Sequence, residues 1–322
     1  MNNTITINTL THKEVQIMAK KRALLVGINY PGTQHALRGC VNDVTTMSEI
    51  LTRQFGFTTN EKRMLTDSAA TTQNILDRLN WLVEGAVPGD VLYFHYSGHG
   101  SQVINTNYDS DREPDGKDEV MVPVDMNWRD KMITDDQLKT IFNKVPTGVN
   151  LTVFMDCCHS GSIMDQTNQY MPLGAATKVI LDPESPLRAR SLPMPADISN
   201  RSIGLDLKVK PSVITSGVDR VGLMISGCQA EQTSADSYFI NKYMGAATYY
   251  MTGLLKKYNY KITYKTLVDE MNKYLVAYKF TQRPQLDGNP DLFDVTFLDP
   301  AISLKRGLDQ VNVPNPEIEI GM

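Results

Sequence analysis

Two glycine-bordered loops carry the side chains of this chain that could act as nucleophile and base. SGHGS at 97–101 places His99 between two glycines, and DCCHSGS at 156–162 contains Cys158. A thiol attacks a carbonyl only as the thiolate, so a catalytic cysteine needs a base beside it. The loops therefore indicate attack of a thiolate on a carbonyl carbon, with the oxyanion held by the backbone N–H groups of Gly100 and Cys158. His99 would then protonate the leaving amine.

Each of these residues also has an ordinary structural explanation. Cysteine is among the most buried residue types, and a glycine-flanked histidine is often only a turn residue. Of the adjacent pair Cys157 and Cys158, only one can face a cleft if the strand continues through both. His95 lies within an apolar run, and we interpret it as an interior histidine with a satisfied ring. The residues alone leave these alternatives open.

Apolar runs predict the strands that position the two loops. Strands are expected at 21–29, 90–98 and 151–156, and the last two lead directly into the histidine and cysteine loops. Helical spacing of apolar residues predicts helices that separate the first two strands, at 41–55 and 72–85. Strands that alternate with helices form parallel βαβ units, which present active sites at the carboxyl ends of the strands.

The expected fold class is therefore α/β, with a mainly parallel central sheet and helices on both faces. Further along the chain, a helix begins near Asp135 and a strand occupies 221–226. The other elements expected in this part are helices near 245–257 and 264–278 and a final strand at 293–298.

Composition excludes several classes of protein. The chain has 322 residues, a net charge of −4 and 41% hydrophobic residues, so it can form a large core and gives no support to a nucleic-acid partner. No stretch reaches the roughly 20 apolar residues of a membrane span, and the polar first 20 residues do not resemble a signal peptide. Four cysteines fit neither a disulfide scaffold nor a zinc site. We expect a cytoplasmic protein with no membrane partner.

Several motifs in a fixed order resemble the type I metacaspases. These motifs are GCVND at 39–43, YSGHGS at 96–101, DEVMVPVD at 118–125, ITDDQL at 133–138, DCCHSGS at 156–162, GCQAEQTSAD at 227–236 and QRPQL at 282–286. The resemblance covers about Arg22 to Leu298 and implies a caspase-like cysteine peptidase of the caspase–hemoglobinase fold. It implies a catalytic dyad of His99 and Cys158, because the family's nucleophile immediately precedes His-Ser-Gly, and Cys157 is then a packing residue.

The resemblance also divides the chain into regions. The expected regions are an N-terminal segment at 1–20, a large-subunit-like catalytic region at 21–165, a linker loop at 166–212, a small-subunit-like region of the same domain at 213–305 and a tail at 306–322. A zymogen that processes itself would cut basic residues of the linker. The candidates, none of them favoured, are Lys178, Arg188, Arg190, Arg201, Lys208 and Lys210.

Metacaspases cleave after Arg or Lys, and a buried cation needs carboxylates to offset its desolvation. Asp156 shares a strand face with Cys158, and Asp43 matches the family's other pocket acid. Cys40 and Ser97 match the residues that line the pocket. The alternative for Asp43 is a cap at the start of the 41–55 helix.

Many type I metacaspases are activated by calcium, and their ligand pattern maps onto four aspartates of this chain. These are Asp118, Asp135, Asp136 and Asp165. Carboxylate oxygens suit Ca²⁺, which is therefore the expected cofactor. The alternatives are a solvated acidic loop around 109–119 and acids that favour a helix N-terminus.

The resemblance thus implies a calcium-dependent endopeptidase, monomeric, that acts on protein or peptide substrates with Arg or Lys at the cleavage site. The alternative is a catalytically silent caspase-fold scaffold or regulator. The chain retains Cys158, His99, Asp156 and Asp43, and a silent homologue usually loses one of these residues.

Overall fold

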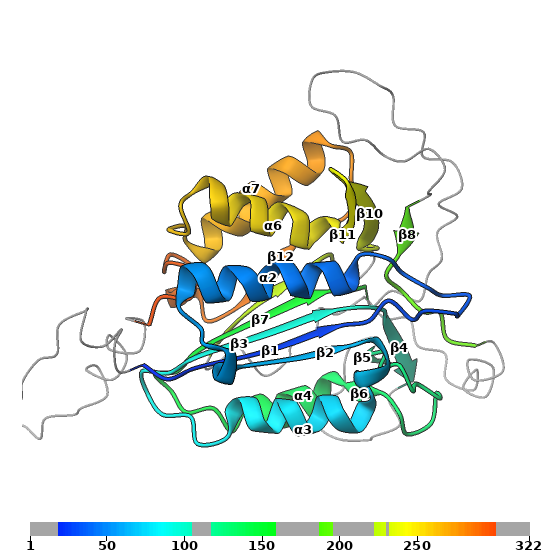
Figure 1. The fold of residues 1–322 in the computed structure, drawn as a ribbon, viewed down its shortest axis with the longest axis horizontal. Coiled ribbons are helices and arrows are strands. Elements are labelled where there is room, and N and C mark those ends of the chain that lie inside the picture. The colour runs from blue at the N-terminus through cyan, green and yellow to red at the C-terminus, as the bar shows by residue number, and fades with distance from the viewer. Residues whose placement is uncertain (1–18, 105–116, 159–186, 196–221, 230–231, 301–322) are drawn as a thin grey trace, which may run out of the picture.

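A six-stranded sheet forms the centre of the molecule in a computed structural model, which describes residues 19–104, 117–158, 187–195, 222–229 and 232–300. Its strands lie in the order β12-β9-β7-β3-β1-β2 (Figure 1). Their bounds are β1 Lys21–Gly27, β2 Lys62–Thr66, β3 Val91–Ser97, β7 Asn150–Asp156, β9 Gly222–Ser226 and β12 Gln285–Gly288. All neighbours are parallel except β12, which runs antiparallel to β9. The predicted mainly parallel α/β fold is confirmed.

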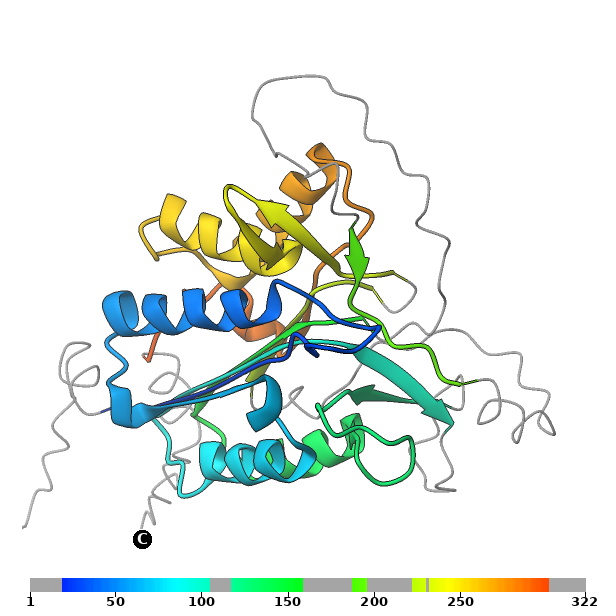
Figure 2. The same cartoon turned by 45° about the vertical axis from the view of Figure 1, so that its right-hand side comes forward.

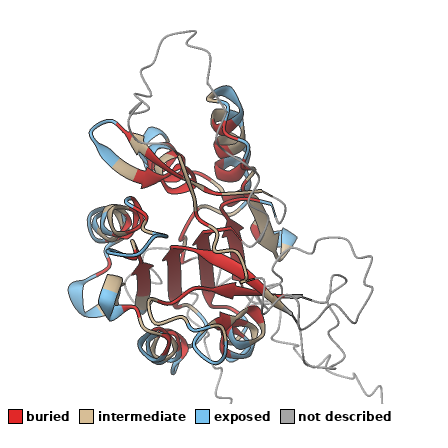
Figure 3. Ribbon diagram, turned by 90° about the vertical axis from the view of Figure 1, so that its right-hand side faces the viewer, coloured by how far each residue is buried: buried red, intermediate tan, exposed pale blue. Residues whose placement is uncertain are grey.

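Helices cover both faces of this sheet (Figure 1). One face packs against α2 (Cys40–Phe55), α6 (Ala246–Lys257) and α7 (Tyr264–Ala277), and the other against α3 (Thr72–Val83) and α4 (Asp135–Phe142). Every residue of β3 and β7 is buried, as expected of parallel strands enclosed on both sides (Figure 3). Neighbouring side chains of one strand therefore enter two separate cores: Leu25 packs toward α2, and Leu24 packs toward α3.

Two small antiparallel sheets lie beyond the carboxyl ends of the central strands (Figure 2). One contains β8 (Arg188–Ala189), β10 (Ala235–Phe239) and β11 (Lys242–Gly245), in the order β11-β10-β8. The other contains β4 (Gly100–Ile104), β5 (Lys117–Met121) and β6 (Ile133–Thr134). Both small sheets are additions to the predicted elements, and β4 begins directly after His99.

The expected final strand at 293–298 is wrong. The chain there follows a short 3₁₀ helix, η5 (Pro290–Leu292), and the strand that joins the sheet is β12, earlier in the chain. The apolar run was misleading because Phe297 and Leu298 are buried without belonging to the sheet ladder. Their segment instead bonds to the start of α7, where the backbone N–H of Tyr264 donates to the carbonyl of Val295 at 3.0 Å.

Strands from both sides of the 166–212 linker share the central sheet, since β9 pairs with β7.

In the described part of the chain, none of the helices combines the length and the apolar character that a membrane crossing requires.

Candidate active site

The register of β3 and β7 brings the histidine and cysteine loops together. Ser97, at the end of β3, pairs with Asp156, at the end of β7. His99 and Cys158 each follow two residues later, so they occupy matching positions on neighbouring strand ends. Both are almost completely buried. This register agrees with the expectation that neighbouring parallel strands bring His99 and Cys158 side by side.

A carbonyl oxygen of the chain itself lies between the two N–H groups expected to hold an oxyanion. The backbone N–H of Gly100 donates to the carbonyl oxygen of Arg190 at 3.0 Å, and that of Cys158 donates to the same oxygen at 3.2 Å. Two converging donors on one carbonyl polarise it and lower the barrier to nucleophilic attack. The arrangement is that of a bound acyl group.

The His99 ring is held in the form that a general base needs. Its Nε2 lies 2.7 Å from the carbonyl oxygen of His35, which can only accept, so Nε2 carries the ring proton. Nδ1 is buried without a hydrogen-bond partner among the described residues and is left as the basic nitrogen. Burial lowers the pKa of His99 to about 4, so the ring is neutral at neutral pH.

Two tyrosines fix the backbone of the His99 loop. The Tyr30 hydroxyl accepts from the His99 N–H at 3.0 Å, and the Tyr96 hydroxyl donates to the His99 carbonyl at 2.6 Å. A Cβ at Gly98 would collide with both hydroxyl groups, which explains the glycine that precedes the histidine. Sequence reasoning did not identify this pair of tyrosines.

The thiol of Cys158 is turned toward Ser234, in the loop before β10. The Ser234 backbone N–H donates to Sγ, and Sγ lies 3.6 Å from the Ser234 carbonyl oxygen. Nδ1 of His99 has no hydrogen-bond partner among the described residues, so the thiol does not hydrogen-bond to its expected base in this position. Cys157 is buried in the core on the α3 side of the sheet, in keeping with the packing role expected for it.

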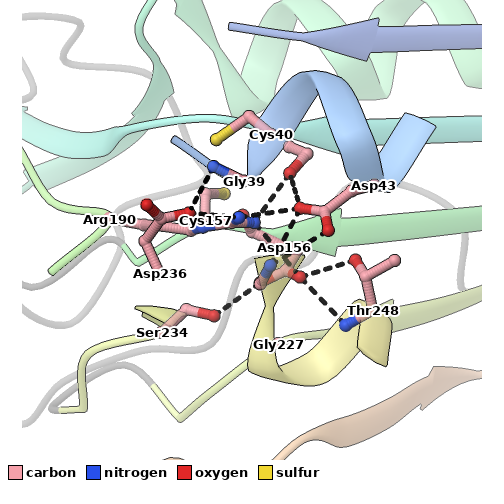
Figure 4. A network of polar contacts seen from close by, with 12 residues as sticks. Gly39, Cys40, Asp43, Asp156, Cys157, Arg190, Gly227, Ser234, Asp236 and Thr248 are labelled. Carbon is pink, nitrogen blue, oxygen red and sulfur yellow. Dashed lines mark hydrogen bonds and ion pairs between the residues drawn. The ribbon is translucent and has the colours of Figure 1, made fainter. Parts of the chain in front are cut away.

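A fully buried pocket beside this centre contains the Arg190 side chain (Figure 4). One terminal nitrogen, Nη2, lies 2.7 Å from Asp43 and 2.9 Å from Asp236. The other, Nη1, lies 3.2 Å from the Asp156 carboxylate. Nη1 also donates to the Ser97 hydroxyl at 2.6 Å. Three carboxylates and a hydroxyl thus surround one guanidinium.

The pocket acids differ in their tendency to ionise. Burial raises the pKa of Asp43 to about 7, although Arg190 opposes this shift. Burial acts in the same direction on Asp156, but Arg190 and hydrogen bonds from Ser234 and Thr248 outweigh it and hold the pKa of Asp156 below its usual range. Asp156 is therefore the permanent anion of the pocket, and Asp43 is partly protonated at neutral pH.

The structure places all four predicted pocket residues around Arg190. The Cys40 thiol is buried against Ser97 at the start of α2. Asp43 does not cap this helix, since the N-cap residue is Gly39, and its carboxylate instead accepts from the Gly245 N–H at 3.0 Å. Of the two explanations for Asp43, the helix cap is excluded.

Sequence reasoning missed Asp236 and Gly245, which both belong to the pocket. Asp236 lies within GCQAEQTSAD, a motif whose acids were not assigned individually. Its carboxylate also accepts from the backbone N–H groups of Arg38 and Gly39, at 2.8 and 2.9 Å, and so joins β10 to the start of α2. A Cβ at Gly245 would collide with Asp156 and the Arg190 guanidinium, a signal invisible without the fold.

His95 is buried as expected, but its ring is not fully satisfied. Its Nε2 lacks a hydrogen-bond partner among the described residues. Burial lowers its pKa to about 3, so it stays neutral and acts as a packing residue beside Phe154.

The proposed calcium ligands are only partly described. Asp118 lies on β5, and Asp135 and Asp136 occupy the first turn of α4, whose cap is Thr134. Asp165 lies outside the described residues. Within the described residues, no three acidic, His or Cys side chains are grouped closely enough to hold a metal ion.

Comparison with known proteins identifies the family. A sequence profile of the metacaspase, peptidase C14 domain matches residues 21–167. Metacaspase-1 of Mycosarcoma maydis is 34% identical over 303 residues, which span 88% of this chain and 74% of that protein. The chain belongs to the metacaspase family. Metacaspase-1 of Schizosaccharomyces pombe is 33% identical over 294 residues, 83% of this chain and 67% of that protein.

A solved structure has a similar fold. A crystal structure of a Geobacter sulfurreducens protein has a TM-score of 0.58 at 26% identity and covers 85% of this metacaspase and 97% of its own chain. Metacaspases are caspase-like cysteine peptidases, so this chain is a cysteine peptidase that acts on proteins or peptides. The caspase–hemoglobinase fold expected from the sequence motifs is confirmed.

Proposed function

We propose that this metacaspase is a calcium-dependent endopeptidase that cleaves after Arg or Lys, with Cys158 as nucleophile and His99 as base. The observation that carries the specificity is the buried pocket in which three carboxylates surround the Arg190 guanidinium. An uncharged or acidic side chain there would leave these carboxylates without a counter-charge, at a cost of several kcal/mol. A basic residue at the cleavage site supplies the missing charge.

The geometry supports the chemical step as well. Once it faces Nδ1 of His99, the Cys158 thiol can pass its proton to that nitrogen, and the thiolate can attack a carbonyl held by the N–H groups of Gly100 and Cys158. His99 then protonates the leaving nitrogen, and water hydrolyses the thioester. The same activity would cut basic residues of the chain's own linker at 166–212.

Fluorogenic peptides that end in Arg, Lys or Asp test this proposal in the presence of Ca²⁺. We expect release of the fluorophore from the Arg and Lys peptides and at least about 10²-fold less from the Asp peptide, because a buried unpaired charge costs about 3–5 kcal/mol. Cys158→Ala should abolish the activity, whereas Cys157→Ser should retain it. Equal rates with and without Cys158, or no cleavage of any peptide under activating conditions, would favour the silent scaffold.

Calcium dependence rests on a mechanical link between the acidic residues and the His99 loop. Asp118 lies on β5, whose Met121 pairs with Gly100 on β4. At the end of β5, the Val122 N–H donates to the His99 carbonyl at 3.2 Å, and the Val122 carbonyl accepts from Tyr30 at 2.6 Å. An ion bound by Asp118, Asp135, Asp136 and Asp165 would hold β5 and so favour the active position of His99.

Removal of calcium by a chelator is expected to lower the turnover of an Arg peptide by about 5- to 150-fold, the usual range of coupling between two sites. Readdition of Ca²⁺ should restore it, and Asp118→Asn should shift the activating Ca²⁺ concentration upward. Isothermal calorimetry on the Cys158→Ala chain measures the binding independently of turnover. Undiminished turnover in excess chelator would refute the calcium proposal and leave the peptidase proposal intact.

A further inference from the structure

The linker segment at 187–192 lies in the site as a substrate would, on the side that precedes the cleaved bond. Arg188 and Ala189 form β8, which pairs antiparallel with Asp236 and Ala235 of β10. The Arg190 N–H donates to the Ser234 carbonyl at 3.0 Å and continues this ladder to the catalytic centre. Addition of a strand to a free sheet edge is a common mode of peptide recognition.

The segment continues past the catalytic centre and is held on the other side as well. The Leu192 N–H donates to the Gly100 carbonyl at 2.8 Å, and the Ser101 hydroxyl donates to the Leu192 carbonyl at 2.5 Å. The Leu192 side chain packs against the core on the α3 side of the sheet. The peptide bond between Arg190 and Ser191 is therefore fixed from both sides, with its carbonyl on the Gly100 and Cys158 donors.

The two described basic residues of the linker are not equivalent. Arg188 is only half-buried and its guanidinium donates to the Ala36 carbonyl, outside the pocket. Arg190 is fully buried with all three pocket acids as partners. A purely structural ion pair would not need its own carbonyl on two N–H donors beside a nucleophile, so the combination indicates a bound substrate.

We propose that the bond between Arg190 and Ser191 is the self-processing site of this metacaspase, and that the intact 187–192 segment keeps the enzyme latent toward other substrates. The inference rests on the proposed peptidase function and adds the bond and its regulatory effect. The Cys158 thiolate forms a bond to the Arg190 carbonyl carbon, and the thiol proton passes to His99. The bond to the Ser191 nitrogen then breaks, and His99 returns the proton to that nitrogen. Water hydrolyses the thioester to a free Arg190 carboxylate and restores the thiol.

Latency follows from competition between the tethered segment and free substrate. A tethered segment has an effective concentration on the order of 1 mM, whereas an external peptide in an assay is present at about 10 μM. The pocket, the oxyanion donors and the β10 edge are all occupied by the segment. Cleavage allows the Arg190 end to leave, because it is then held on one side only.

Four chains test the proposal: the unaltered chain, Arg190→Gln, Arg188→Gln and Ser191→Pro. After addition of Ca²⁺, intact-mass spectrometry should find fragments 1–190 and 191–322 from the unaltered chain and from the matched control Arg188→Gln, and not from Arg190→Gln. Ser191→Pro should keep Arg190 docked, because the Ser191 N–H donates no hydrogen bond within the described residues, while the proline ring hinders cleavage.

Activity on an external Arg peptide then measures latency. Arg190→Gln should be active from the first measurement, and Ser191→Pro should start at least about tenfold lower. For the unaltered chain, cleavage of the external peptide should begin after a lag, which ends as the fraction of chains cut after Arg190 rises. This lag can be measured whether or not Ser191→Pro folds.

Three outcomes overturn the inference: a first cut at another basic residue, processing of Arg190→Gln at the same position, or full initial activity of the uncut unaltered chain. These outcomes are distinct from failure of the proposed function, in which none of the chains, including Arg190→Gln, would cleave an Arg peptide.

Discussion

Asp156→Asn is expected to lower kcat/KM for Arg and Lys peptides by roughly 10²- to 5 × 10³-fold, because removal of one partner of a buried ion pair costs about 3–5 kcal/mol. Asp156 pairs with Arg190 Nη1 at 3.2 Å and accepts hydrogen bonds from the Ser234 hydroxyl at 2.5 Å and from the Thr248 hydroxyl at 2.6 Å. An asparagine amide would direct its NH₂ group at one of these donors. Because Arg190 forms this buried pair in the folded chain, we also expect the free energy of unfolding to fall by about 3–5 kcal/mol.

Asp43→Asn is the matched control for this prediction. Because the pKa of Asp43 is raised to about 7, its carboxyl group is already partly protonated near neutral pH, and asparagine resembles that neutral form. We expect a smaller loss of kcat/KM, about tenfold, from one weakened hydrogen bond to a charged group. Steady-state kinetics with Arg peptides, and urea unfolding in the Cys158→Ala background, provide the measurements. Equal losses for the two variants would contradict the assignment of Asp156 as the permanent anion.

Gly245→Ala is expected to lower kcat/KM for Arg peptides by about 10²-fold or more by filling the pocket. The added Cβ would collide with the Asp156 carboxylate and with the guanidinium position of Arg190. The backbone at Gly245 has φ −68° and ψ 137°, which alanine adopts without strain, so the effect is steric. Overpacking of a tight interior costs about 1–3 kcal/mol before the weakened ion pairs are counted.

Gly253→Ala is the control for added methyl volume on the same helix. Gly253 lies inside α6 with nothing near the position of its absent Cβ, and alanine there should stabilise the helix by about 0.5–1 kcal/mol. Its kcat/KM should equal that of the unaltered chain. If Gly245→Ala retained normal KM for Arg peptides, the pocket would not be the recognition site for the basic side chain.

Much of the fold follows from patterns that are local in the sequence. The periodicity of α2 and α3 and the apolar runs of β1, β3 and β7 predicted these elements to within a few residues. The strand prediction at 293–298 failed because an apolar segment can be buried without pairing to another strand. Apolar periodicity does not reveal which elements lie beside a segment. The short strands β4, β8, β10 and β11 were missed because pairing, more than composition, forms them.

For the site, a strand end followed by a glycine-bordered histidine or cysteine is a local signal that made His99 and Cys158 candidates. The resemblance to the metacaspase motifs then selected them over the structural alternatives. The position of Asp156 two residues before Cys158 also followed from the strand period. From the sequence, the role of Asp43 was open between a helix cap and a pocket acid. Only the tertiary contacts with Ser97, Gly245 and Arg190 excluded the cap.

The sequence by itself supplied a thiol, an imidazole and carboxylates at the expected ends of parallel strands, and the resemblance to the metacaspases assigned their expected roles. Only the tertiary structure decided that Asp236 completes the pocket, that Gly245 must lack a side chain, and which of six basic linker residues occupies the site. These facts depend on contacts between residues up to about 200 positions apart, such as the Gly245 N–H on Asp43. Contacts between residues so far apart in the sequence form only when the sheet and its helices pack, and no local sequence pattern encodes them.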